Sequence, residues 1–124
     1  MAFTILVVDD SALIRRSITT LLEIDGFNTE IADDGLTALA RLKNGLKPDL
    51  MITDINMPNM NGLDLIRHVR CLPAFRFMPI LVITTESQQS MRDDAKKYGA
   101  TGWVVKPVGG ELLSSIIKKL LPGA

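Results

Sequence analysis

The stretch ILVVDD, residues 5–10, places four apolar residues directly before two adjacent carboxylates. Three of the four are β-branched, and a continuous apolar run of this kind is typical of a strand that is covered on both faces. Two neighbouring carboxylates at the end of such a strand disfavour each other's ionisation, because like charges repel. The sequence therefore raises the question of which group stabilises Asp9 and Asp10.

The composition limits the kinds of protein that this chain can be. Its 124 residues are 47% hydrophobic and 23% charged, as expected for one globular domain over residues 1–124 without an output domain. Fourteen basic residues balance fourteen acidic ones, so the basic excess of a nucleic-acid-binding protein is absent. The sequence shows no signal peptide and no apolar run of the ~20 residues that a membrane span needs. We therefore predict a cytoplasmic protein that does not insert into membranes, with Cys71 as a partly buried thiol.

Short β-rich runs alternate with helical patterns along the chain. The runs predict strands over residues 4–8, 27–31, 49–53, 79–83 and 102–105. The intervening patterns predict helices over residues 12–25, 35–44, 62–70, 87–98 and 111–121. This alternation predicts an α/β fold, a doubly wound five-stranded parallel sheet with helices on both faces.

The first predicted helix has recognisable ends and an apolar face. Ser11 is placed to cap its start and Gly26 to end it. The apolar residues at helical spacing are Leu13, Ile14, Ile18, Leu21 and Leu22. We expect this face to cover the sheet.

Polar residues follow four of the five predicted strands. They are Asp9 and Asp10 after the first strand, Asp54 after the third, Thr84 and Thr85 at the end of the fourth, and Lys106 after the fifth. The functional site of an open parallel sheet lies beyond the carboxyl ends of its strands, so neighbouring strands would bring these groups into one crevice. Each of these polar residues, taken alone, also has an ordinary structural explanation as part of a turn or the start of a loop. A functional site is favoured because they occur together at the ends of four strands.

This set of groups has a chemical logic. Three close carboxylates favour a hard divalent cation such as Mg²⁺, which prefers oxygen ligands. A cation, a lysine and a hydroxyl are also what a phosphoryl group needs around its oxygens. Asp54, from the middle of the sheet, is the best candidate for a nucleophile that carries phosphate as an acyl phosphate.

Over nearly its full length the chain resembles response-regulator receiver domains of the stand-alone CheY-like, chemotaxis type. The resemblance is carried by VVDD at 7–10, TDINMPNMNG at 53–62, ITT at 83–85 and VVKP at 104–107. It implies a flavodoxin-like sheet with strand order 2-1-3-4-5. It also implies a monomer that works in two-component signal transduction.

The resemblance implies a metal site and a phosphoacceptor. Asp54 would accept a phosphoryl group from a histidine kinase of the chemotaxis type. Asp10, Asp54 and the backbone carbonyl of Asn56 would bind Mg²⁺, for which Mn²⁺ is a possible substitute. Asp9 would contribute through a bound water.

The resemblance also implies a conformational switch. Lys106, whose peptide bond to Pro107 is expected to be cis, would pair with the phosphoryl group. Thr84 would move to donate a hydrogen bond to it, with Trp103 as its rotameric partner. The surface formed by residues 87–108 would then bind a downstream protein target.

Three positions depart from the family pattern, and two others are expected to affect the lifetime of the phosphoryl group. Trp103 replaces the usual Tyr or Phe, Thr85 replaces a small residue, and Val108 replaces the usual Phe. The larger Trp103 is expected to restrict the switch, and Thr85 to slow access of water or phosphodonor. Asn56 and Glu86 are polar residues that can orient an attacking water, which predicts a short-lived phosphoryl state.

Other functions remain open. The same chemistry fits a phosphate sink for a shared kinase. A Mg²⁺-dependent aspartyl phosphohydrolase usually has a second Asp two residues after the nucleophile, and that position is Asn56 here. A flavodoxin-like cofactor binder would need a phosphate-binding loop after the first strand, where DDSA places two negative charges instead. We therefore expect a signalling protein that catalyses its own phosphorylation and dephosphorylation, not an enzyme acting on an external substrate.

Overall fold

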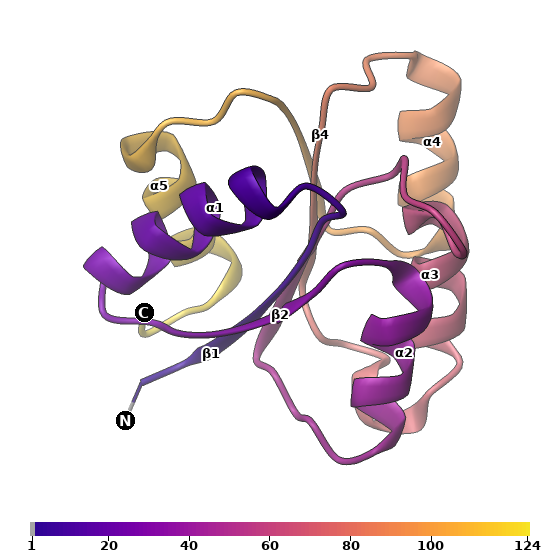
Figure 1. Ribbon diagram of the computed structural model, residues 1–124, viewed down its shortest axis with the longest axis horizontal. Coiled ribbons are helices and arrows are strands. Elements are labelled where there is room, and N and C mark those ends of the chain that lie inside the picture. Colours follow the sequence, from indigo (N-terminus) through magenta and orange to yellow (C-terminus); the bar gives the residue numbers. More distant parts are fainter. Residues whose placement is uncertain (1) are drawn as a thin grey trace.

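The computed structural model describes residues 2–124 and contains one five-stranded sheet with helices on both faces (Figure 1). The strands are β1 (Thr4–Val8), β2 (Asn28–Ala32), β3 (Leu50–Thr53), β4 (Ile80–Thr84) and β5 (Gly102–Val105). The helices are α1 (Ala12–Ile24), α2 (Gly35–Lys43), α3 (Gly62–Arg70), α4 (Gln89–Tyr98) and α5 (Gly110–Leu120), with a short 3₁₀ helix η1 (Pro73–Phe75). All predicted strands and helices are present within two residues of their predicted bounds, and η1 is an addition.

The strands lie in the order β2-β1-β3-β4-β5, and every neighbouring pair is parallel. This confirms the predicted doubly wound, flavodoxin-like arrangement. All residues of β3 and β4 are buried, whereas the edge strands β2 and β5 are partly exposed. β3 and β4 are two of the three interior strands, and their sequences, LMIT and ILVIT, are almost continuously apolar, because helices cover both of their faces.

Alternate residues of each strand supply two separate cores. Leu6 and Val8 of β1 pack with α2, α3 and α4, and Ile5 and Val7 pack with α1 and α5. Figure 1 shows the same division, with α1 and α5 on one side of the sheet and α2, α3 and α4 on the other. The period of two along a strand therefore determines which helices each strand residue contacts.

The ends of α1 are as predicted. The Ser11 side chain accepts a hydrogen bond from the Ile14 backbone N–H at 3.3 Å. Gly26, just beyond the helix, has a φ of 89°, in the left-handed region that favours glycine. Among residues 2–124, no helix combines the length and the apolar character required to cross a bilayer.

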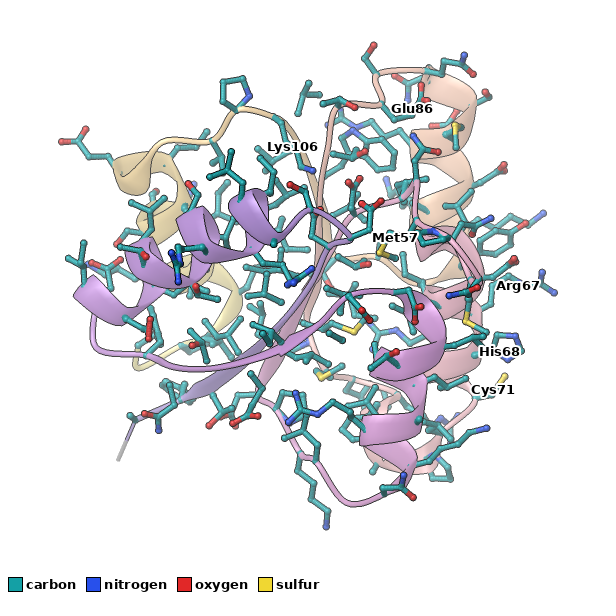
Figure 2. All side chains as sticks on the ribbon, viewed as in Figure 1. Met57, Arg67, His68, Cys71, Glu86 and Lys106 are labelled. Carbon is teal, nitrogen blue, oxygen red and sulfur yellow. The ribbon has the colours of Figure 1, made fainter. Side chains whose placement is uncertain are left out.

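Two predictions about side-chain burial are wrong. Leu13 was expected on the covered face of the first helix, but it is 76% exposed. Ile18 and Leu22 are the buried residues of α1, and Ile14 and Leu21 pack against the same core. The helix covers the sheet with a narrower stripe than its apolar residues occupy. Cys71 was expected to be partly buried, but it is exposed at the end of α3, near His68 on the outer side of the molecule (Figure 2).

Candidate functional site

Backbone hydrogen bonds extend the sheet past the ends of its strands and place three site residues. The Asp9 N–H donates to the Ala32 carbonyl at 3.2 Å, and the Asp54 N–H donates to the Val8 carbonyl at 3.0 Å. The Lys106 N–H donates to the Thr84 carbonyl at 2.8 Å. These residues therefore follow β1, β3 and β5 at the carboxyl edge of the sheet, where the sequence predicted a site.

Lys106 joins the two buried carboxylates. Its Nζ atom lies 2.8 Å from Asp9 Oδ2 and 2.8 Å from Asp54 Oδ2. The Asp9 residue is 2% exposed and Asp54 is 8% exposed, so both ion pairs are largely shielded from water. Burial alone would lower the pKa of Lys106, but hydrogen bonds to Asp54 and Asp9 and the charges of both carboxylates outweigh it and raise that pKa. Lys106 is therefore held in its charged form.

The second oxygen of each buried carboxylate accepts a hydrogen bond from the backbone. Asp9 Oδ1 accepts from the Ser11 N–H at 2.9 Å, and Asp54 Oδ1 accepts from the Ile55 N–H at 2.7 Å. Arg15 donates to the Asp9 carbonyl at 2.7 Å and ties the start of α1 to the same turn. These contacts could not be predicted from the sequence, because they depend on local turn geometry and not on residue spacing.

Asp10 completes an acidic cluster with Asp9 and Asp54. One carboxylate oxygen from each residue can be chosen so that all three lie within 4.8 Å of one another. Asp10 is exposed and makes no ion pair within residues 2–124. Lys106 balances the charge of one of the three carboxylates. No other cationic side chain of the described residues is paired with the cluster.

These donors fit a hard divalent cation. The cluster offers carboxylate oxygens on adjoining strands, and in residues 2–124 the backbone carbonyl of Asn56 accepts no backbone hydrogen bond. Mg²⁺ takes oxygen ligands of these two kinds and retains several waters, which the exposed side of Asp10 admits. The residues present therefore suit the cation that the sequence predicted.

Thr84 lies at the end of β4 but is not bonded to the acidic cluster. Its side chain is fully buried, and its hydroxyl accepts a hydrogen bond from the Glu86 N–H at 3.2 Å. Trp103 is half-buried and packs against the core beneath α2, α3 and α4. In the sheet, Val82 pairs with Trp103 and Thr84 with Val105, so Thr84 and Trp103 lie two positions apart on the same face.

The residues predicted to tune phosphoryl lifetime lie on loops around the cluster. Asn56 and Thr85 are exposed, and Glu86 is half-buried. A Glu86 carboxylate oxygen accepts from the Gln88 N–H at 3.0 Å, so this side chain is turned toward its own loop. Figure 2 shows Glu86 and Lys106 at the same end of the molecule, on the loops that follow β4 and β5.

The loop after β5 also matches the sequence prediction. The Lys106–Pro107 peptide bond is cis. Val108, which stands where the family usually has Phe, packs against the core formed with α1 and α5.

Comparison with known proteins agrees with this architecture. The family model of the response regulator receiver domain matches residues 5–118. The chain belongs to this family. The chemotaxis protein CheY of Pseudomonas aeruginosa is 43% identical over 117 residues, which cover 94% of both chains. CheY-3 of Vibrio cholerae is 41% identical over 117 residues, covering 94% of this chain and 89% of that protein.

Solved structures give the same result. The chemotaxis protein CheY4 of Vibrio cholerae superposes with a TM-score of 0.92 at 37% identity, covering 98% of this chain and 100% of that one. A response regulator from Chloroflexus aurantiacus superposes with a TM-score of 0.90 at 28% identity, covering 97% and 98% of the two chains. The protein is therefore a two-component receiver domain of the CheY type, with the acidic pocket of that family formed by Asp9, Asp10 and Asp54.

Proposed function

We propose that Asp54 accepts a phosphoryl group from a phosphohistidine of a chemotaxis-type histidine kinase. The observation that carries the proposal is the position of Lys106 Nζ, 2.8 Å from both Asp54 and Asp9 at the carboxyl edge of the sheet. An Asp54 oxygen forms the new P–O bond while the P–N bond of the donor breaks, and the bonding electrons leave on the imidazole nitrogen. Lys106 stabilises the negative charge on the oxygens of the transferring group.

Asp10, Asp54 and the Asn56 carbonyl would hold Mg²⁺, or Mn²⁺ in its place, with Asp9 contributing through a bound water. When bound, the cation neutralises negative charge on the carboxylates and on the phosphoryl oxygens. The Ile55 N–H already holds Asp54 Oδ1 by a hydrogen bond. Asp54 Oδ2, which accepts a hydrogen bond from Lys106, is therefore the oxygen that would react. Transfer would thus replace an ion pair of Lys106 with Asp54 by one with the phosphoryl group.

Thr84 is the residue that would respond first to phosphorylation in the conformational switch proposed for this protein. Its hydroxyl, now an acceptor for the Glu86 N–H, would turn and donate to a phosphoryl oxygen. That movement would affect Trp103 on the same face of the sheet. Trp103, Arg92 and Lys96 line a groove of about 400 Å³ between α4 and β5, within the 87–108 surface proposed to bind the downstream target.

We infer a role in chemotaxis or motility from the two chemotaxis relatives, with the protein acting as a cytoplasmic monomer. The protein would catalyse its own phosphorylation and dephosphorylation, and Asn56, Thr85 and Glu86 would set the lifetime of the phosphoryl group. A phosphate sink would use the same site without a target. A phosphohydrolase is disfavoured because Asn56 has no acidic proton to supply as the usual second Asp would.

Tryptophan fluorescence tests the proposal, since Trp103 is the single tryptophan. The wild type and the Asp54→Asn variant are titrated with Mg²⁺ and then with beryllofluoride, a phosphoryl analogue. We expect a Mg²⁺-dependent change and a further beryllofluoride change that the variant lacks. A wild type that binds Mg²⁺ but gives the same beryllofluoride response as Asp54→Asn would contradict the role of Asp54.

A further inference from the structure

The loop between β3 and α3, residues 54–61, is fastened to the start of α2. Asn59 Nδ2 donates to Asp34 Oδ2 at 2.6 Å. The Gly35 N–H donates to the Met60 carbonyl at 3.2 Å. A residue of the loop after β3 and a residue before α2 thus meet across 25 positions of sequence, and the contact holds the loop that carries Asn56.

Asp34 uses both of its carboxylate oxygens. Oδ1 accepts from the Thr37 N–H at 2.8 Å and caps α2, while Oδ2 accepts from Asn59. Asp34 is 7% exposed, and these hydrogen bonds hold its pKa below the ordinary value of 3.8. The contact to Asn59 is therefore a charge-assisted hydrogen bond, which is stronger than a neutral one.

The loop has an unusual backbone conformation at one residue and packs closely against two glycines. Asn59 has a φ of 67°, a left-handed conformation that costs an L-residue about 1 kcal/mol or more and that Asn tolerates better than most. A Cβ atom on Gly35 would lie 2.6 Å from the Met60 carbonyl oxygen, and one on Gly62 would lie 2.0 Å from the Asp54 carbonyl oxygen. The loop thus packs closely against the start of α2 at Met60, and its two ends are joined by a hydrogen bond from the Gly62 N–H to the Ile55 carbonyl at 2.8 Å. Asn56, between these contacts, is exposed.

We propose that the Asp34–Asn59 pair is a positioning element that fixes the loop carrying the Asn56 carbonyl for the magnesium site, an inference that rests on the proposed function. Mg²⁺ requires nearly octahedral geometry and tolerates displaced ligands poorly. Partners that orient a ligand from outside the coordination sphere contribute about 10- to 100-fold to metal affinity in other sites. Neither Asp34 nor Asn59 touches the reacting atoms, so both act through the loop.

Two single variants remove the contact with little other change. Asp34→Ser keeps a side chain that caps α2 but is too short to reach Asn59. Asn59→Gly suits the left-handed φ and removes the donor. Asp49→Ser serves as the matched control, because Asp49 also accepts a backbone hydrogen bond, from the Thr4 N–H at 2.8 Å, but lies at the opposite edge of the sheet.

Isothermal titration calorimetry with Mg²⁺ measures the effect without any phosphodonor. We expect each single variant to bind Mg²⁺ about tenfold more weakly, the double variant to bind no more weakly than either single one, and Asp49→Ser to bind as the wild type does. Circular dichroism at the titration temperature establishes that each variant is folded. A wild type that binds Mg²⁺ while both single variants bind it equally well would overturn the positioning role alone. A wild type that binds no Mg²⁺ would overturn the proposed function together with it.

Discussion

Lys106 Nζ and Asp54 Oδ2 lie 2.8 Å apart, although 52 positions of sequence separate the two residues. The same ammonium also contacts Asp9 at 2.8 Å, so one cation joins the ends of three strands. Two of these strands, β1 and β3, are hydrogen-bonded neighbours, and Lys106 reaches them from β5, beyond β4. The contact is therefore a consequence of strand order, and it gives the acidic cluster its internal positive charge.

Replacing Lys106 is predicted to destabilise the fold. In Lys106→Met, two largely buried carboxylates lose their cation, and breaking such buried pairs typically costs about 3 to 5 kcal/mol. Urea unfolding with and without Mg²⁺ measures the loss, and we expect Mg²⁺ to stabilise the variant more than the wild type. Lys118→Met, at an exposed position of α5, is the control and should change the free energy of unfolding by less than about 0.5 kcal/mol. Equal losses at the two positions would contradict the role given to Lys106.

The Asp34 carboxyl is predicted to make stability depend on acid pH. The ordinary pKa of this carboxyl, 3.8, applies to the unfolded chain. Hydrogen bonds from Thr37 and Asn59 hold its folded-state pKa below that value. Its stabilisation is therefore complete above pH 3.8 and is lost as the pH falls through the lower, folded-state pKa. We expect the difference in unfolding free energy between the wild type and Asp34→Ser to be constant at neutral pH and to shrink in this acid range. A difference that does not change with pH would show that the carboxyl is not stabilised in its charged form.

Arg70 is predicted to matter more than its neighbour Arg67. Arg70 donates to the Gly99 carbonyl from Nε at 3.2 Å and from Nη2 at 2.7 Å, and to the Phe75 carbonyl at 2.6 Å. Hydrogen bonds to charged groups contribute about 1.5 to 3 kcal/mol, so Arg70→Met should lower the free energy of unfolding by at least about 2 kcal/mol. Arg67 lies over the Tyr98 ring at 5.2 Å with its side chain 59% exposed, and Arg67→Met should cost about 1 kcal/mol or less. Chemical denaturation of the two variants compares them directly, and a larger loss from Arg67→Met would refute the assignment.

A methyl group at Gly62 is predicted to disturb the site itself. The added Cβ would lie 2.0 Å from the Asp54 carbonyl oxygen, so either the start of α3 or the backbone of Asp54 must move. Overpacking of this kind costs about 1 to 3 kcal/mol, and here it should also weaken Mg²⁺ binding. Gly109→Ala meets no atom within 4 Å and has an ordinary φ, so it should leave Mg²⁺ affinity unchanged. Thermal unfolding measures the stability of Gly62→Ala and Gly109→Ala, and calorimetry measures their Mg²⁺ affinity. Unchanged Mg²⁺ affinity in Gly62→Ala would count against a rigid Asp54 backbone.

The sequence predicted most of the fold because its apolar runs and turns are unambiguous. The run ILVV ended by Asp9, and LMIT ended by Asp54, each indicate an interior strand with a polar residue at its carboxyl end. The meeting of Lys106 with both carboxylates then follows from parallel strand order, which the family resemblance supplied. The strands and helices themselves needed only local pattern, whereas the order of the strands needed the resemblance.

The remaining features depend on contacts between distant segments. Periodicity placed Leu13 on the covered face of α1, but it cannot say how wide a stripe the sheet covers, and Leu13 is exposed. The contact of Asp34 with Asn59 and the bonds of Arg70 to two backbone carbonyls require the final positions of separate loops. Asp34 directly before a helix is an N-cap signal, but nothing nearby in sequence identifies the partner of its second oxygen.

Site-resolved mass spectrometry tests the central claim most directly. The wild type, Asp54→Asn and Asp10→Asn are incubated with acetyl phosphate and Mg²⁺, with a parallel sample in excess chelator. Borohydride then reduces any aspartyl phosphate to homoserine, which marks its position in a peptide digest. The account predicts homoserine at position 54 in the wild type, strongly reduced by the chelator and by Asp10→Asn, and none in Asp54→Asn. Homoserine at another aspartate, or an equal yield at position 54 without Mg²⁺, would contradict it.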